Sequence, residues 1–252
     1  MRSFPWMLVI IIASSLAVGC GPGKPDPKDL DLSAELAVVE EARAAWDEAW
    51  QKLQDLEAEQ KELKGKTRPT AEERTRLAEL DTEIKAAREL ADELFTADDE
   101  ALTGFLNKWV NDAPTNPSVL RGLRLYADKA IRNANTFMTA SGNYVRAIEI
   151  LQNASRIFED VGEEVPEDLT EALGMAREYR YLSKERFDQI ARRMTEDEVR
   201  AITGTPNFHN VREGESGGRK IITWLFQRTD GEVAAVYFHN GRVYQMTWQV
   251  ER

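Results

Sequence analysis

Apolar residues recur at alternating spacings of three and four along two stretches of the first half of the chain, which is the period of an amphipathic helix. The first set, interrupted by the polar Gln60, is Val39, Ala42, Trp46, Ala49, Leu53, Leu56 and Leu63. The second set follows the segment KGKTRPT and is Leu77, Leu80, Ile84, Ala87, Ala91 and Leu94. Thr70 and Glu73 have the spacing of a capping box, which predicts the start of the second helix. We therefore predict an antiparallel helical hairpin over residues 31–96.

The charged residues of this hairpin are interpreted as its solvated face. The alternative is an extended arm that contacts a partner or spans part of the periplasm.

Helical spacing continues through residues 97–186. A short helix is predicted around Leu102–Val110, and a longer one begins at Pro117, runs towards Thr139 and ends at Ser141-Gly142. The next helix is predicted in the segment GNYVRAIEILQNASRIF. Residues 166–190 open with a proline and an acidic first turn, both typical of a helix start, and are predicted to supply a packing helix.

Residues 187–252 change from helical to alternating patterns. Thr195 and Glu198 form a second capping box, and the helix that they start is predicted to end at Gly204, since Pro206 cannot continue it. Extended runs follow, punctuated by Gly217-Gly218 and by the hairpin signals Asp230-Gly231 and Asn240-Gly241. In the last run, alternation places four apolar residues on one face: Tyr244, Met246, Trp248 and Val250. We predict a three-stranded antiparallel meander covered on one face by helices, within a fold that is mostly α with a C-terminal α+β domain.

The chain begins with MRSFPWMLVIIIASSLAVGC, a basic residue followed by a short apolar run and small residues. This is typical of a secretory signal peptide, here residues 1–19, and is short of the roughly 20 residues that span a bilayer. LAVGC resembles the bacterial lipobox, which implies that Cys20 carries a lipid. The alternatives are an ordinary signal peptide in which the cysteine occurs by chance, and a short membrane anchor that is not cleaved. Residues 20–30 are proline-rich and predicted to be an extended tether.

The 252 residues include one cysteine and carry a formal charge of −11. A single cysteine excludes an intramolecular disulfide framework, and the acidic balance argues against nucleic-acid binding. His209 and His239 lack the helical spacing of metal ligands, and no nucleophile elbow or phosphate-binding glycine loop is present. The sequence therefore predicts no enzyme activity, no metal and no cofactor.

The C-terminal residues resemble the BamE (SmpA/OmlA) family of outer-membrane lipoproteins. The resemblance covers roughly residues 187–252 and rests on Met194, Thr195, Val199, Gly204 and Pro206. Arg193 stands where the family generally has Gly. The same α/β shape also serves β-lactamase-inhibitor-like proteins, so the fold alone does not fix the function.

Residues 142–158 resemble the second helix of a tetratricopeptide (TPR) repeat. Gly142 and Tyr144 match its turn residues, and Ala147 and Ala154 match the small residues at which two helices approach closely. The preceding helix departs from the repeat at Ala134, Asn135 and Met138. The resemblance implies a groove that binds peptides, and its candidate lining residues are Lys129, Arg132, Thr136 and Thr139; ordinary surface is the alternative for each of them.

These features together predict a non-enzymatic cell-envelope lipoprotein that binds other proteins, on the periplasmic face of the outer membrane. The BamE resemblance implies a role in outer-membrane assembly or maintenance, with assembly components as partners. The alternative is a secreted inhibitor or ligand-binding module. Because neighbouring residues on a strand face opposite ways, either Tyr237 or Phe238 is expected on the uncovered face of the sheet, in contact with a partner or the membrane surface. The alternative is that the helical region folds back over that face.

Overall fold

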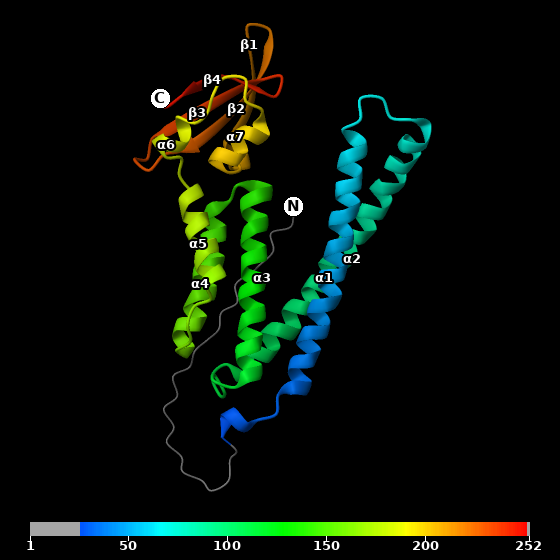
Figure 1. Ribbon diagram of the computed structural model, residues 1–252, viewed down its shortest axis with the longest axis vertical. Helices are drawn as coiled ribbons and strands as arrows, with labels where there is room; N and C mark the ends of the chain where they lie inside the picture. The colour runs from blue at the N-terminus through cyan, green and yellow to red at the C-terminus, as the bar shows by residue number, and fades with distance from the viewer. Residues whose placement is uncertain (1–25, 251–252) are drawn as a thin grey trace. The chain divides into compact units, whose positions relative to one another are not determined.

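A computed structural model describes residues 26–250, apart from the side chain of Ser216. Its contacts divide the chain into a first unit that ends at Leu125 and a second unit that begins at Tyr126. The first unit contains a 3₁₀ turn, two long helices and the start of a third: η1 (Pro27–Asp29), α1 (Ser33–Lys64), α2 (Ala71–Trp109) and α3 (Pro117–Ser141). The second unit contains the rest of α3, further helices and a sheet (Figure 1).

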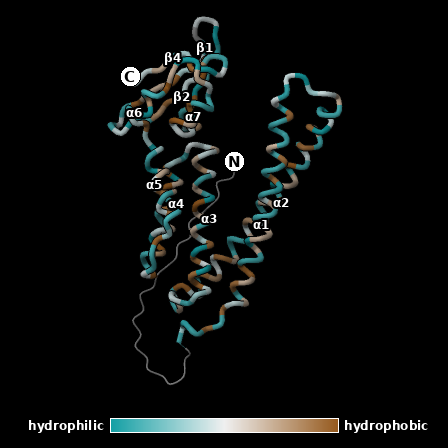
Figure 2. The backbone as a smooth tube through the Cα atoms, in the orientation of Figure 1, coloured by the Kyte–Doolittle hydropathy of each residue, from teal (hydrophilic) through white to brown (hydrophobic). Residues whose placement is uncertain are grey.

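Helices α1 and α2 pack as the predicted antiparallel hairpin. The capping box is formed as expected, since the Glu73 N–H donates to Thr70 Oγ1 at 3.2 Å and the Thr70 N–H donates to a Glu73 carboxylate oxygen at 2.7 Å. The buried seam between the helices consists of residues from both predicted sets: Ala49, Leu53, Leu80, Ile84, Ala87 and Ala91. In Figure 2 hydrophobic positions alternate with hydrophilic ones along both helices, which is the amphipathic pattern read from the sequence.

Helix α2 is longer than predicted. The separate helix expected around residues 102–110 is the last part of α2, which runs to Trp109. No proline or glycine interrupts the chain between Ala71 and Leu102, so nothing ends the helix there. Leu102 and Phe105 are buried and continue the apolar face of the helix. The expected boundary after residue 96 therefore falls inside α2.

A buried ion pair lies inside the first unit. Arg43 Nε donates to Asp98 Oδ1 at 2.8 Å, and the Arg43 guanidinium also donates to the Leu125 carbonyl at 3.2 Å. The two side chains are 7% and 0% exposed. The guanidinium carbon lies 5.3 Å from the centre of a Trp46 ring. Arg43 thus joins α1 both to α2 and to the start of α3.

In the second unit, α4 (Tyr144–Val161) packs against α5 (Glu167–Tyr179). Ala147 and Ala154 are fully buried, as expected of small residues where helices approach closely. The packing helix predicted over residues 166–190 is present but ends at Tyr179. The chain beyond it forms a β-bridge at Leu182 and the short helix α6 (Lys184–Phe187).

The sheet of the second unit is an antiparallel meander, as predicted, but it has four strands instead of three. They lie in the order β1 (Val211–Ser216), β2 (Arg219–Gln227), β3 (Val233–His239) and β4 (Arg242–Thr247). The additional strand is β1, whose residues 212–215 are polar or glycine and exposed. It forms through backbone pairing, with Gly214 opposite Ile221, and buries almost no side chain. For that reason the apolar pattern gave no sign of it.

Helices cover one face of this sheet. The core beneath α6 and α7 (Glu196–Thr203) consists of Leu182, Phe187, Ile190, Val199, Trp224, Phe226, Ala234, Val236, Phe238 and Val243. The predicted capping box starts α7, because the Glu198 N–H donates to Thr195 Oγ1 at 3.2 Å and the Thr195 N–H donates to a Glu198 oxygen at 2.7 Å. Figure 1 shows α6 and α7 on the same side of the strands.

A β-bulge interrupts the pairing of β3 with β4. Phe238 lies opposite Val243, while the preceding Tyr237 lies opposite Gln245, which leaves Tyr244 as an extra residue in β4. Val243 is buried in the core beside Phe238, and Tyr244 is 49% exposed.

The bulge corrects the predicted alternation of the last strand. Met246 and Trp248 pack against the core, as expected of one apolar face. Tyr244 does not share that face, because the extra residue shifts the strand between Val243 and Met246. A strand without the bulge would have placed Tyr244 inside and Val243 outside.

Candidate functional site

The described residues contain no candidate metal site. Among residues 26–250, no group of three or more His, Cys, Asp or Glu side chains could hold a metal ion. His209 is exposed and its ring lies against that of Phe208, with ring centres 3.7 Å apart and planes inclined by 38°. His239 lies at the end of β3, where its Nδ1 is 3.2 Å from the Lys220 carbonyl oxygen. Neither histidine therefore belongs to a candidate metal site among the described residues.

Of the four residues predicted to line a TPR-like groove, two are exposed, one is half-buried and one is buried. Lys129 is only 3% exposed, so it cannot line a groove that admits a peptide. Arg132 is half-buried. Thr136 and Thr139 are exposed, but their hydroxyls donate to carbonyls of their own helix, at 3.1 Å to Arg132 and 2.8 Å to Asn135. Helical spacing placed these residues on one side of α3 but could not show how deeply that side is buried.

The residues that resemble TPR turn positions have a different role, which is to join the helices of the second unit to its α/β part. Gly142 has a φ of +60°, and a Cβ there would lie 2.5 Å from the Pro206 carbonyl oxygen. Thr205 Oγ1 donates to the Thr139 carbonyl at 3.2 Å, and the Asn207 side chain approaches the Gly142 carbonyl at 3.5 Å. The turn between α3 and α4 therefore packs directly on the segment that follows α7.

Two tyrosines complete this junction. Tyr144 at the start of α4 stacks against Tyr179 at the end of α5, with ring centres 6.4 Å apart and planes inclined by 22°. Gly204, at a φ of +77°, lies so close that a Cβ would overlap the Tyr144 hydroxyl. Burial raises the pKa of Tyr144 above its ordinary value. The Arg186 guanidinium lies 4.8 Å from the Tyr179 ring centre. Gly204 is thus required both by its backbone conformation and by the tyrosine beside it.

Of the two aromatic residues predicted for the uncovered sheet face, the structure places only Tyr237 there. Phe238 is 1% exposed and belongs to the core beneath the helices, so it cannot contact a partner. Tyr237 is half-buried on the opposite face. Tyr244, which alternation had placed on one face with Met246, Trp248 and Val250, is the more exposed aromatic of this strand pair.

The α1–α2 hairpin carries the net charge of the protein. Helices α1 and α2 contain 20 of the 44 Asp and Glu residues but only 9 of the 33 Lys and Arg residues. Their formal charge of −11 equals that of the whole chain, and the remaining residues are neutral in sum. Composition along the sequence could have revealed this asymmetry, which singles out the hairpin as a strongly acidic element.

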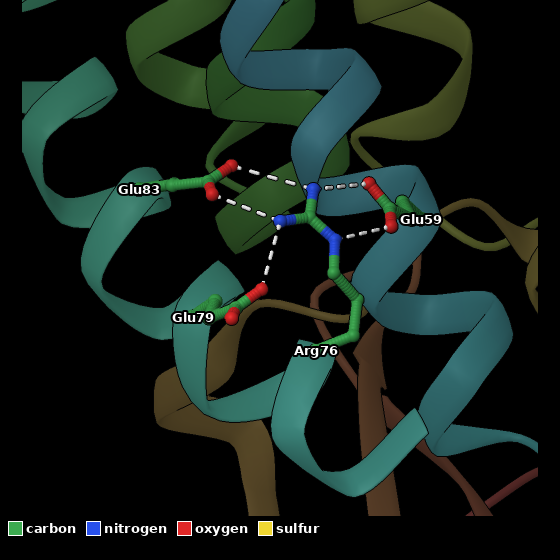
Figure 3. Close-up of polar contacts among 4 residues, drawn as sticks. All are labelled: Glu59, Arg76, Glu79 and Glu83. Atoms are coloured by element: carbon green, nitrogen blue, oxygen red, sulfur yellow. Dashed lines mark hydrogen bonds and ion pairs between the residues drawn. The ribbon is translucent and has the colours of Figure 1, made fainter. Parts of the chain in front are cut away.

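Several cations of the hairpin are already engaged by its own carboxylates. Figure 3 shows Arg76 of α2 between Glu59 of α1 and two glutamates of α2. Its guanidinium donates to both oxygens of Glu59 at 2.8 and 3.0 Å, and to both oxygens of Glu83 at 2.8 and 3.3 Å. A Glu79 oxygen lies 3.5 Å away. These bonds raise the pKa of Arg76 and lower that of Glu59. Arg76 therefore links α1 to α2 and offers little free charge to a partner.

The predicted lipid attachment at Cys20 and the signal peptide lie outside the described residues. Within residues 26–250, no helix combines the length and apolar character that crossing a membrane requires. Any membrane attachment through Cys20 thus stays a prediction from the sequence.

Comparisons with models of known protein families, with curated proteins and with solved structures gave no match to this chain.

Proposed function

We propose that this protein is a non-enzymatic lipoprotein of the cell envelope, anchored through Cys20, in which the acidic α1–α2 hairpin docks a partner protein. The observation that carries the proposal is the concentration of the whole net charge, −11, on a two-helix element with its own buried seam. The negative electrostatic potential of such an element attracts a basic protein surface and repels an acidic one.

Two further features support an adaptor over an enzyme. The described residues contain no group of His, Cys, Asp or Glu side chains that could hold a metal ion, and close contacts at Gly142 and Gly204 join the helices of the second unit to its α/β part. The resemblance of its C-terminal part to BamE-like lipoproteins supports a role in outer-membrane assembly or maintenance, with assembly components as partners.

Reversal of charge on the hairpin tests the docking role. Glu48, Glu93 and Glu100 are exposed residues of α1 and α2, and their combined substitution Glu→Lys changes the charge of the hairpin by six. We expect this variant to lose the envelope protein that co-purifies with the tagged wild type in detergent. The matched control makes the same change of charge in the second unit, at the exposed residues Glu164, Glu171 and Glu178.

The control variant should retain the partner. Retention of the same partner by both variants, or equal loss from both, would contradict docking through the hairpin. Metabolic labelling with a clickable fatty acid tests the anchor separately. The wild type should be labelled and Cys20→Ser should not, whereas a secreted inhibitor would be released unlabelled in both forms.

A further inference from the structure

A buried asparagine fastens the N-terminal end of the described chain to the first unit. Asn116 is only 1% exposed. Its Nδ2 donates to the carbonyls of Leu30 and Pro27 at 3.0 and 3.1 Å, and the Lys28 carbonyl lies 3.4 Å away. Its Oδ1 accepts from the Ser118 N–H at 2.9 Å, in the first turn of α3. One buried amide therefore caps α3 and holds η1 beside it.

The same end of the first unit joins α1 to α2. Near the start of α1, the Glu35 carboxylate accepts hydrogen bonds at 2.9 Å from Lys108 Nζ and from Trp109 Nε1, at the end of α2. We call residues 27–35 and 108–118 the base of the hairpin. The contacts of Asn116 and Glu35 thus fix the chain that follows Cys20 to the base.

Chain length limits how far the base can lie from Cys20. Pro27 follows Cys20 by seven residues. An extended chain spans at most roughly 3.6 Å per residue, so the base lies within about 25 Å of Cys20. Helix α1 has 32 residues, which at roughly 1.5 Å per residue gives a length of about 48 Å. The loop of residues 65–70, at the other end of α1 and α2, is therefore the end of the hairpin remote from Cys20 (Figure 1).

Charge opposes an orientation in which the hairpin lies along an anionic bilayer. Of the 20 acidic residues of α1 and α2, all but three lie outside residues 61–76, the segment around the loop. That segment is basic in sum. With the base held near the anchor, however, it could reach lipid headgroups only if the acidic length of the hairpin lay against them as well. The negative surface potential of anionic lipid repels that length.

We propose that the base of the hairpin lies at the membrane surface and that the hairpin projects away from it into the aqueous space. This inference rests on the proposed lipidation of Cys20 and adds which end of the hairpin faces the membrane. Asn116 is the residue that keeps the base close to the lipid. The partner that docks on the hairpin accordingly presents a water-soluble basic surface beside the membrane, and not a surface embedded in the bilayer.

Energy transfer to lipid tests this orientation on the full lipoprotein. The protein is reconstituted in vesicles of phosphatidylethanolamine and phosphatidylglycerol, with an acceptor dye on some headgroups. The chain has one cysteine, which the lipid occupies, so an introduced cysteine takes a donor dye specifically. The exposed positions are Asp112→Cys in the base and Arg68→Cys in the loop. We expect transfer from Asp112→Cys to exceed that from Arg68→Cys about twofold or more, since about 48 Å of helix separates the two ends.

Asn116→Ser tests the role of Asn116 in this geometry. Serine caps a helix about as well as asparagine, but its hydroxyl is too short to reach the carbonyls of η1. The chain free to extend would then run to the buried Leu32, twelve residues after Cys20, or about 43 Å. Transfer from Asp112→Cys should fall while helix content stays the same. The matched control is Asn111→Ser, at an exposed asparagine of the same turn, which should leave the transfer unchanged.

Equal transfer from the two labelled positions would show a hairpin that lies along the membrane, and greater transfer from Arg68→Cys would show that the loop faces it. Either result would overturn the proposal. Low transfer from both positions, or transfer unchanged in Asn116→Ser, would also overturn it, because Asn116 would then not hold the base near the lipid. Failure of the anchor gives a separate result, since a chain without lipid does not float with the vesicles. Failure of hairpin docking is separate as well, because the vesicles contain no partner protein.

Discussion

The buried pair of Arg43 and Asp98 gives a quantitative test of how the first unit is held together. Asp98→Ala leaves the Arg43 guanidinium without the carboxylate that accepts its Nε–H at 2.8 Å, in a site where the two side chains are 7% and 0% exposed. Removing one partner of a buried pair costs roughly 3–5 kcal/mol, because the remaining charge stays away from water. We expect Asp98→Ala to lower the free energy of unfolding of the first unit by about this amount.

Replacing both partners by apolar residues should cost less than removing one. In Arg43→Met combined with Asp98→Leu neither charge of the pair is left buried, so the penalty of an unpaired Arg43 disappears. The Leu125 carbonyl, which accepts from Arg43 at 3.2 Å, loses its donor, and an unsatisfied buried carbonyl costs about 1–3 kcal/mol. The double variant should therefore be less stable than the wild type but more stable than Asp98→Ala.

Urea unfolding is the suitable assay, because an uncharged denaturant does not screen the pair. Helix content follows the unfolding of α1 and α2 together with the other helices. Trp46, whose ring centre lies 5.3 Å from the Arg43 guanidinium carbon, is one of six tryptophans that contribute to the fluorescence. A loss below about 1 kcal/mol in Asp98→Ala would refute the reasoning, since it would mean that water reaches Arg43. A double variant less stable than Asp98→Ala would show that packing, and not the unpaired charge, dominates.

Three further predictions concern the stability of the second unit, measured by urea unfolding. Gly204→Ala should lower the free energy of unfolding by roughly 2–4 kcal/mol, through left-handed backbone strain and overlap with the Tyr144 hydroxyl. Adding Tyr144→Ala should relieve only the overlap. Equal stability of Gly204→Ala and the wild type would contradict the close approach. Arg193→Gly should stabilise the folded chain by about 0.5–1 kcal/mol, because Arg193 has a φ of +74°. A loss of stability would show that the contacts of the Arg193 side chain outweigh the relief of backbone strain. The hydrogen bond from the Thr195 N–H lowers the pKa of Glu198. The stability that Glu198 contributes is therefore complete above a pH of about 4.3 and is lost as the pH falls through the lowered pKa. Glu198→Gln should remove this part of the pH dependence of stability, and an unchanged loss of stability at acid pH would contradict the prediction.

Local spacing in the sequence predicted those parts of the fold that depend on local physics. Thr70 with Glu73 and Thr195 with Glu198 start helices because a capping box is completed within four residues. The buried seam of the hairpin follows from helical period alone. These features need no knowledge of distant parts of the chain.

The features that the sequence did not predict depend on pairing between distant residues. Strand β1 forms by backbone hydrogen bonds to β2 and leaves no apolar pattern. The bulge in β4 moves Tyr244 out of the core, and only the register with β3 reveals it. Lys129 lies at a helical spacing typical of a surface, yet it is buried. For the same reason Tyr237 and Phe238 could not be distinguished until the face that packs on the helices was known.

Site-specific photo-crosslinking in the native envelope tests most directly whether the hairpin is the docking element. A photoreactive amino acid is placed at exposed positions of α1 and α2, Glu48 and Glu93, and at exposed control positions of the second unit, Glu164 and Glu171. The hairpin positions should give an adduct with one envelope protein, and that adduct should weaken as salt is raised, because screening reduces attraction between exposed charges. Adducts confined to the control positions, or none from the hairpin at any salt concentration, would contradict the proposal.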